Sequence, residues 1–163
     1  VGWTNESIKE TYDLASKDFP SCLLRLSANY PVPNATGHVI DFSTATVIVD
    51  NDNMYDSAVS ISKLIIKTAG IYLIEINAKY EANSNGTRNM SIIKNDTVYV
   101  VSDSFSPPDG VSMYSRKINC ILNLDVNDWI EMRVFQSSGD TLNIVPEADI
   151  SGEIKVVYLS AGV

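Results

Sequence analysis

Histidine is nearly absent from this chain of 163 residues, and His38 is the only one. A serine or cysteine triad needs a histidine base, so any such triad would have to use His38, which follows Gly37 at the edge of a short strand-like run. The sequence also contains no HExxH metal motif, no nucleophile elbow and no phosphate-binding loop. These absences predict that the protein is not an enzyme.

Cysteine is also scarce. Cys22 and Cys120 are the only two, and neither has a histidine or a second cysteine at metal-binding or redox spacing. The pattern therefore indicates neither a zinc site nor thioredoxin-like chemistry. Both lie at apolar positions of alternating runs, where a free cysteine behaves as a small hydrophobic residue. We expect two buried free thiols, with a disulfide as the alternative.

Positive charge is in short supply, because 12 Lys and Arg face 20 Asp and Glu, for a net charge of −8. Nucleic acids and anionic membranes attract Lys and Arg, so we expect neither as a partner. No apolar run approaches the ~20 residues of a membrane span, so membrane insertion is not expected either. A chain of this length is expected to form one main domain that buries ~70% of its unfolded surface.

The chain begins with valine, without a methionine or a leader, which predicts a processed or excised fragment that lacks an N-terminal part. Within residues 3–19, apolar side chains recur at helical spacing, namely Ile8, Tyr12, Ala15 and Phe19. Pro20 ends this run. We expect residues 1–20 to form a short helical or stalk segment, with a linker from a longer parent as the alternative. Residues 21–163 then form the head domain.

Residues 70–96 show the clearest strand pattern of the chain. One apolar set occupies alternate positions, namely Tyr72, Ile74, Ile76, Ala78 and Tyr80. The polar stretch 83–86 ends in glycine, which can supply the positive φ of a reversal. We therefore expect residues 70–80 and 88–94 to form a hairpin, followed by a further turn at 95–96.

Strand-like runs fill the rest of the chain, at the ~8–12-residue spacing typical of sandwiches. They are residues 22–30, 38–42, 45–49, 62–68, 97–101, 112–124, 129–136, 142–145 and 152–160. Residues 31–34 contain two prolines and are expected to form a loop. A second long hairpin is expected around 125–128. The pattern predicts an all-β fold, an antiparallel β-sandwich or jelly roll, with no helix after Pro20.

Three segments carry recognisable strand motifs. Residues 70–74 contain Gly-x-Tyr, residues 122–130 contain Leu-x-Leu, a turn and Asp-x-aliphatic, and residues 151–158 begin with Ser-Gly. Together, in this order, they resemble the complement globular-head and tumour-necrosis-factor superfamily of jelly rolls. Asn127 stands in place of that family's usual glycine, which the tolerance of Asn for positive φ allows.

Residues 83–88 and 92–95 further resemble the version of this domain found on bacteriophage and other viral fibres and spikes. The family implies a tumour-necrosis-factor-like, bell-shaped homotrimer whose distal loops bind a receptor or a glycan, and it has no catalytic residues to carry over. The first hypothesis is therefore a receptor-binding or adhesion head on a virion surface, where it binds a host-surface glycan or protein.

Two other hypotheses remain open. One is a structural module that trimerises or decorates a fibre without binding a ligand. The other is a secreted, extracellular lectin of a cellular organism that resembles a complement head. A binding assay separates the first two hypotheses, and a signal peptide with collagen repeats upstream would favour the third.

The same alternation predicts a subunit interface. If Tyr72 and Ile74 point inward, the residues between and after them point out of the sandwich, and their mixture of apolar and polar types favours burial in an oligomer. The strand order implied by the resemblance brings Glu75, Lys117 and Lys155 together as a charge layer. The full predicted interface is Leu73, Glu75, Asn77, Lys117, Asn119, Ile121, Lys155, Val157 and Leu159.

Two further sites are predicted from loop composition. Exposed aromatic and amide side chains commonly bind sugars. The candidate ligand-binding residues are Tyr30, Asn34, Tyr55 and Tyr114. Asp50, Asp52 and Asp56 lie in one polar loop, and hard cations prefer several oxygen ligands from such a loop. That loop lacks the glycine and terminal glutamate of an EF-hand, so ordinary turn chemistry is favoured over calcium, and no cofactor is expected.

Overall fold

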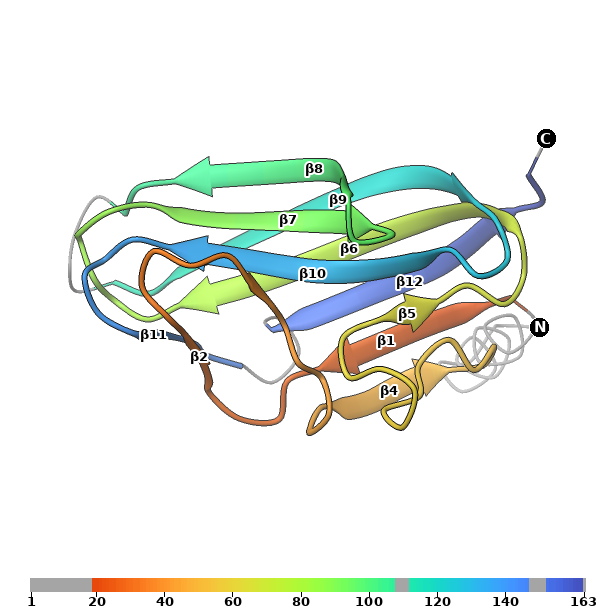
Figure 1. Cartoon of the computed structure of the whole chain (residues 1–163), viewed down its shortest axis with the longest axis horizontal. Helices are drawn as coiled ribbons and strands as arrows, with labels where there is room; N and C mark the ends of the chain where they lie inside the picture. The colour runs from red at the N-terminus through yellow and green to blue at the C-terminus, as the bar shows by residue number, and fades with distance from the viewer. Residues whose placement is uncertain (1–18, 108–111, 147–151, 163) are drawn as a thin grey trace, which may run out of the picture.

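The computed structural model describes residues 19–107, 112–146 and 152–162. The helical or stalk segment predicted for residues 1–20 therefore lies almost wholly outside the described residues. The described part consists of two antiparallel sheets stacked face to face (Figure 1). None of its segments is a helix long and apolar enough to cross a membrane.

The larger sheet has seven strands. Their order is β2 (Tyr30–Val32), β11 (Leu142–Ile144), β6 (Gly70–Tyr80), β12 (Glu153–Ser160), β1 (Ser21–Arg25) and β4 (Thr46–Asp50), and β9 (Tyr114–Leu124) pairs with the other side of β6. The smaller sheet has the order β3 (His38–Val39), β10 (Trp129–Gln136), β7 (Arg88–Lys94) and β8 (Val98–Phe105), and β5 (Leu64–Ile65) pairs with β10. This arrangement confirms the predicted antiparallel jelly-roll sandwich.

The core lies between the sheets, where the alternation of each strand places its apolar set. All five predicted core residues of β6, from Tyr72 to Tyr80, have no exposed surface. Facing them are fully buried side chains of the smaller sheet, namely Met90, Ile92, Ile130, Met132 and Val134. Each such side chain contributes roughly 1.5–3 kcal/mol by leaving water, so the two buried faces hold the sheets together.

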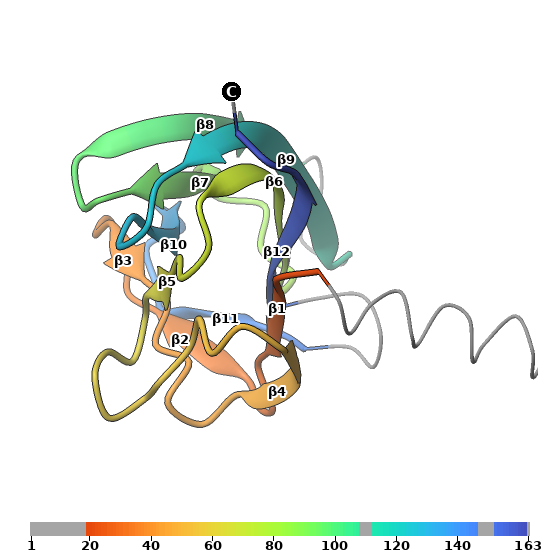
Figure 2. The same ribbon diagram turned by 90° about the vertical axis from the view of Figure 1, so that its right-hand side faces the viewer.

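The two long hairpins predicted from sequence are wrong. β6 pairs with β12 and β9 in the larger sheet, whereas β7 pairs with β10 and β8 in the smaller one. β9 and β10 are separated in the same way, so residues 81–87 and 125–128 cross from one layer to the other (Figure 2). The sequence pattern does not distinguish the two arrangements, because each of these four strands buries one apolar face. Two such strands can lie in facing sheets ~10 Å apart, or they can hydrogen-bond side by side in one sheet.

A buried arginine fixes the first of these crossings. Arg88 has no exposed surface, and its guanidinium donates hydrogen bonds to the carbonyl oxygens of Asn83 (2.9 Å), Asn85 (2.8 Å) and Thr87 (3.2 Å). Gly86 has a φ of +67° and lies so close to the Ser137 carbonyl that a Cβ would overlap it. The crossing is therefore held by specific contacts.

Pro31 lies inside a strand, contrary to the prediction of a loop over residues 31–34. β2 pairs with β11 through Val32 opposite Leu142 and Tyr30 opposite Ile144. Because β2 is at the edge of its sheet, the missing N–H of proline removes no ladder bond.

Two predicted backbone features are confirmed. β7 and β8 form a hairpin whose turn contains Asn95 and Asp96 at φ of 52° and 63°. Asn127 has a φ of 73°, as expected for a residue in place of glycine.

Both cysteines are free, as predicted, although Cys120 is only half-buried. They occupy one cross-strand row, in which Val156 and Ile74 separate Cys22 from Cys120. Three strand spacings amount to about 14 Å, well beyond the reach of a disulfide. Burial raises the pKa of the Cys22 thiol, and the nearby Asp50 carboxylate raises it further, so this thiol stays protonated.

Candidate subunit interface

The register of three adjacent strands brings the predicted interface residues onto one outward surface. Three rows run across β12, β6 and β9. The rows are Val157–Leu73–Ile121, Lys155–Glu75–Asn119 and Glu153–Asn77–Lys117, and Leu159 follows at the end of β12. We call this surface the β9–β6–β12 face.

One end of this face is apolar and open. Ile121 is 62% exposed and Leu159 is 47% exposed, while Leu73 and Val157 beside them are half-buried. Aliphatic side chains gathered in one row on an outer sheet surface are typical of a surface that another protein covers.

A charge pair adjoins the apolar row. Lys117 Nζ lies 2.8 Å from Glu75 Oε1, with the two side chains 56% and 20% exposed. Lys155 stands directly opposite Glu75 on the next strand. The predicted adjacency of these three residues is confirmed. In water such a pair contributes only ~0–1 kcal/mol, so its importance depends on whether the face is covered.

Asn77 differs from the prediction, because it is only 3% exposed in the single chain. Its side-chain amide donates a hydrogen bond to Glu153 Oε2 at 3.1 Å, and Glu153 Oε1 accepts another from Arg25 Nε at 2.5 Å. Asn77 therefore belongs to a polar row within the chain, and little of it is left for a partner. Sequence reasoning missed Glu153 and Arg25, although both alternate with buried residues of their strands.

The predicted ligand residues do not form one site. Tyr30 and Tyr114 lie in a single cross-strand row with Ile144 and the buried Tyr80, and residues opposite each other point to the same side of a sheet. Both rings therefore turn toward the interior. The Tyr30 hydroxyl contacts His38 Nε2 at 2.8 Å and accepts a hydrogen bond from the Asp41 amide at 3.1 Å.

The other two ligand candidates differ in exposure and in their contacts. Tyr55 lies within the acidic loop, between Asp52 and Asp56, and its hydroxyl is buried with no hydrogen-bond partner within the described part. Asn34 is exposed, and its Oδ1 accepts a hydrogen bond from the Gly139 amide at 2.9 Å. Of the four candidates, Asn34 alone lies on an exposed loop.

The alternative of a calcium site on the acidic loop is not supported. Asp50 accepts hydrogen bonds from the amides of Met54 (2.8 Å) and Tyr55 (3.1 Å), and Asp56 accepts one from the Ala58 amide (2.9 Å). Across the described residues, no three acidic, histidine or cysteine side chains are placed to hold a metal ion. Asp50 and Asp56 thus stabilise turns.

Three loops interlock at one end of the sandwich. Residues 33–37 contact 137–141 through the Asn34–Gly139 bond, and the Ser137 amide donates to the Thr87 carbonyl of loop 83–87 at 3.0 Å. The buried Gln136 amide donates to the Val32 and Asp140 carbonyls. The start of β1 and the end of β12 lie side by side at the opposite end (Figure 1). Apart from Asn34, sequence reasoning did not select these loops.

The outward surface of the smaller sheet is built differently. The Asn89 amide donates hydrogen bonds to Ser102 Oγ (2.8 Å) and Ser104 Oγ (2.7 Å), and Ser91 Oγ lies 3.1 Å from Asn89 Oδ1. We call this group the Asn–Ser network. Its polar groups satisfy one another within the chain.

Comparison with known proteins places the fold. No protein-family model and no curated protein sequence matches the chain. A structure of Eiger TNF from S. frugiperda is similar with a TM-score of 0.62 and 14% identity, over 89% of this chain and 95% of that one. The fold is the tumour-necrosis-factor-like jelly roll. The crystal structure of murine APRIL has the same fold, with a TM-score of 0.60 and 10% identity over 85% of this chain and 99% of that one. Neither structure supports the narrower resemblance to viral fibres.

Proposed function

We propose that this domain is the recognition head of a homotrimer that assembles through the β9–β6–β12 face and binds a receptor outside the cell. The observation that carries the proposal is the exposed apolar row at Ile121 and Leu159, which adjoins the Glu75–Lys117 pair. Covering this row with another copy would remove apolar surface from water at ~25 cal/mol per Å² and would place the charge pair in a drier environment.

The similarity in fold supports three copies as the number. This support is an analogy at the level of the fold, because one fold can serve several functions. In the version that the sequence resemblance favours, the trimer is the head of a viral or bacteriophage fibre on the virion surface, and its ligand is a host-surface glycan or protein. The extracellular alternative is a secreted protein of a cellular organism.

The proposed recognition surface is the interlocked loop end, which points away from the start of β1 and the end of β12. Hydrogen bonds between loops fix their conformation in advance, which lowers the entropy cost of binding. We propose recognition and not catalysis for the domain, and the engagement of His38 by the Tyr30 hydroxyl is in keeping with that role.

Light scattering tests the assembly. A trimer is expected to have three times the 17.9 kDa chain mass at micromolar concentration, and a stable monomer would overturn the proposal. Binding to whole cells and to a glycan array then tests recognition. An intact trimer that binds neither would favour a structural module over a receptor-binding head.

A further inference from the structure

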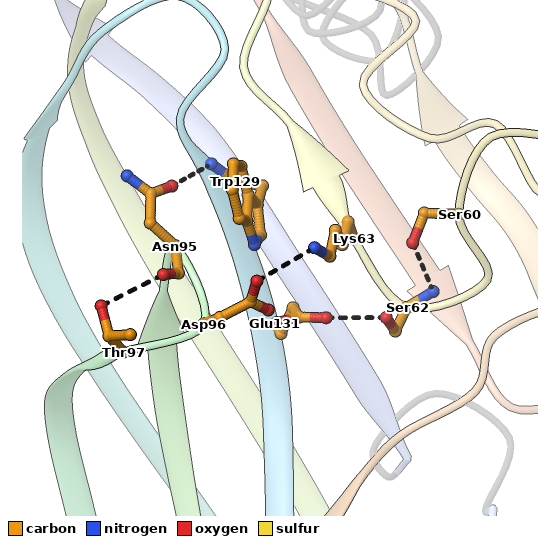
Figure 3. A network of polar contacts seen from close by, with 8 residues as sticks. All are labelled: Ser60, Ser62, Lys63, Asn95, Asp96, Thr97, Trp129 and Glu131. Atoms are coloured by element: carbon orange, nitrogen blue, oxygen red, sulfur yellow. Dashed lines mark hydrogen bonds and ion pairs between the residues drawn. The ribbon is translucent and has the colours of Figure 1, made fainter.

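Two carboxyl groups meet on the outer side of the smaller sheet (Figure 3). Glu131 lies on β10 and is only 4% exposed, whereas Asp96 lies in the β7–β8 turn with its side chain 58% exposed. Figure 3 shows the two carboxyl groups side by side, and each shifts the pKa of the other. An ionised carboxylate has only acceptors, so two adjacent carboxyl groups can hydrogen-bond to each other only while one of them carries a proton.

The surroundings provide one cation for the two acids. Lys63 Nζ lies 3.4 Å from Asp96 Oδ2 and 4.2 Å from the centre of the Trp129 ring. Ser62 Oγ donates a hydrogen bond to Glu131 Oε1 at 2.7 Å. With one proton, the carboxyl pair carries a single negative charge that Lys63 balances. Without it, two negative charges face one lysine at short range and repel each other.

Neighbouring charges do not change this balance. Beyond Asn95, Asp128 and Lys94 pair with each other at 2.6 Å, so each neutralises the other. Burial raises the pKa of Glu131, and the contact with Asp96 acts in the same direction, against the Ser62 hydrogen bond. The hydrogen bond from Glu131 lowers the pKa of Asp96. Of the two acids, Glu131 therefore takes up a proton more readily.

The carboxyl pair joins three parts of the fold. Asp96 belongs to the turn, Glu131 to β10, and Lys63 to the segment that enters β5. The same turn also exchanges hydrogen bonds with β10, because the Asn95 amide donates to the Trp129 carbonyl (3.1 Å) and the Trp129 amide donates to Asn95 Oδ1 (2.9 Å). Directly after the turn come Val98 and Tyr99, which are 52% and 54% exposed.

We propose that the Asp96–Glu131 pair is a proton-operated latch on the β7–β8 turn. While the pair shares a proton, the turn is held against β10 and the Lys63 segment. When the proton leaves, repulsion between the two carboxylates loosens the turn and changes the position of Val98 and Tyr99. Because the fold favours the protonated form of Glu131, the latch is closed at acidic pH and opens as pH rises through the upper apparent pKa of the pair.

Carboxyl carbon NMR of the wild-type domain tests the shared proton directly. The two carboxyls are expected to titrate in two separate steps that both nuclei sense, as interacting sites do. A single step in which both behave as isolated acids would overturn the proposal. This measurement needs no variant, so it decides the question even if a substitution at Glu131 prevents folding.

Tryptophan fluorescence tests the motion. Trp3 and Trp129 are the two tryptophans, so a Trp3→Phe background leaves Trp129, beside the turn, as the reporter. Its emission is expected to change at the upper step. Glu131→Gln should abolish that change, because an amide always offers a proton to Asp96. Asp103→Asn, on β8 and away from the pair, should leave the change in place. An unaltered pH transition in Glu131→Gln would refute the latch.

Discussion

The two outward sheet surfaces show how one antiparallel frame can face different surroundings. On the smaller sheet, the Asn–Ser network satisfies its own polar groups, and Ile93 on the same side is only 2% exposed. On the larger sheet, Ile121 is 62% exposed and the charges of Glu75 and Lys117 adjoin it. The Asn–Ser network of the first surface makes its hydrogen bonds within the single chain, whereas the apolar row of the second surface gains free energy when it is covered.

The difference teaches that the alternation of a strand determines which side chains point outward but not what they meet. Both surfaces come from strands with similar alternation. What distinguishes a solvent-exposed surface from a proposed interface is the chemistry of the outward side chains. The register of the strands matters as well, because it decides which of those side chains lie next to one another. The following predictions test that separation.

The largest effect is expected from Ile121→Asp. The new carboxylate would lie in the covered row without a partner, at a cost on the order of 3 kcal/mol or more per copy, so the trimer should be lost. Light scattering should report the mass of one chain. Val98→Asp is the matched control, since Val98 is 52% exposed on β8 and its substitution should leave the trimer intact. If both variants had the same oligomeric mass, the proposed difference between the two outward surfaces would be wrong.

A comparison of two ion pairs should give the next largest effect. Glu75→Ala would leave Lys117 and Lys155 without a partner in a covered face, and the trimer should lose about 3–5 kcal/mol of stability. Apolar replacement of all three residues should be tolerated much better. Asp103→Ala breaks the Arg116–Asp103 pair, which is 3.9 Å long and half-exposed, and should cost ~0–1 kcal/mol. Thermal melting of the trimers decides between them, and a Glu75→Ala trimer that melts like wild type would discard the charge layer.

Removing the centre of the Asn–Ser network should have a smaller effect. Asn89→Ala eliminates the hydrogen bonds to Ser102 and Ser104, and the free energy of unfolding should fall by about 1.5 kcal/mol. The oligomeric mass should stay unchanged, because this surface serves the single chain. Denaturant titration with Ser104→Ala, which removes one of the two bonds, provides the graded control. A change in assembly state in Asn89→Ala would contradict the assignment.

A pH effect of about 1 kcal/mol or less is expected from Asp128. Partial burial acts to raise its pKa, but hydrogen bonds from Lys94, Asn95 and the Asp125 amide lower the pKa overall. A lowered carboxyl pKa gives stability that is present above the unfolded value, ~3.9, and is lost as pH falls through the folded value. Asp128→Asn should flatten this acid limb. Because the contacts lie within one chain, the same flattening should occur in the Ile121→Asp background.

Much of the fold follows from the sequence because alternation reports burial directly. The alternation predicts that every second residue from Tyr72 to Tyr80 lines the core, and these side chains are fully buried. The partition of strands between sheets does not follow, since the apolar face of β7 can pack beside β6 or across from it. The loop predicted around Pro31 is wrong for a similar reason, because a proline is excluded from a central strand but not from an edge strand such as β2.

The sites were harder to predict than the fold, since they depend on register. The sequence offers Tyr30 and Tyr114 as aromatic residues near loops, yet the register puts them in a row with the buried Tyr80. Arg88 and Glu131 give no sign in the sequence that they are buried. Their environment comes from segments far away along the chain, such as the Ser62 hydroxyl on Glu131.

The strand order has a consequence for the speed of folding. Among the described strands, β7 and β8 are the one pair of consecutive strands that hydrogen-bond to each other, and every other ladder joins segments distant in sequence. A hairpin forms in roughly 1–10 μs, whereas domains dominated by non-local pairing fold in milliseconds to seconds. We therefore expect a slow refolding phase after dilution from denaturant, limited by the pairing of strands that are distant in sequence. During that interval the apolar edges of unpaired strands are open to other chains, so the refolding yield should fall as the chain concentration rises.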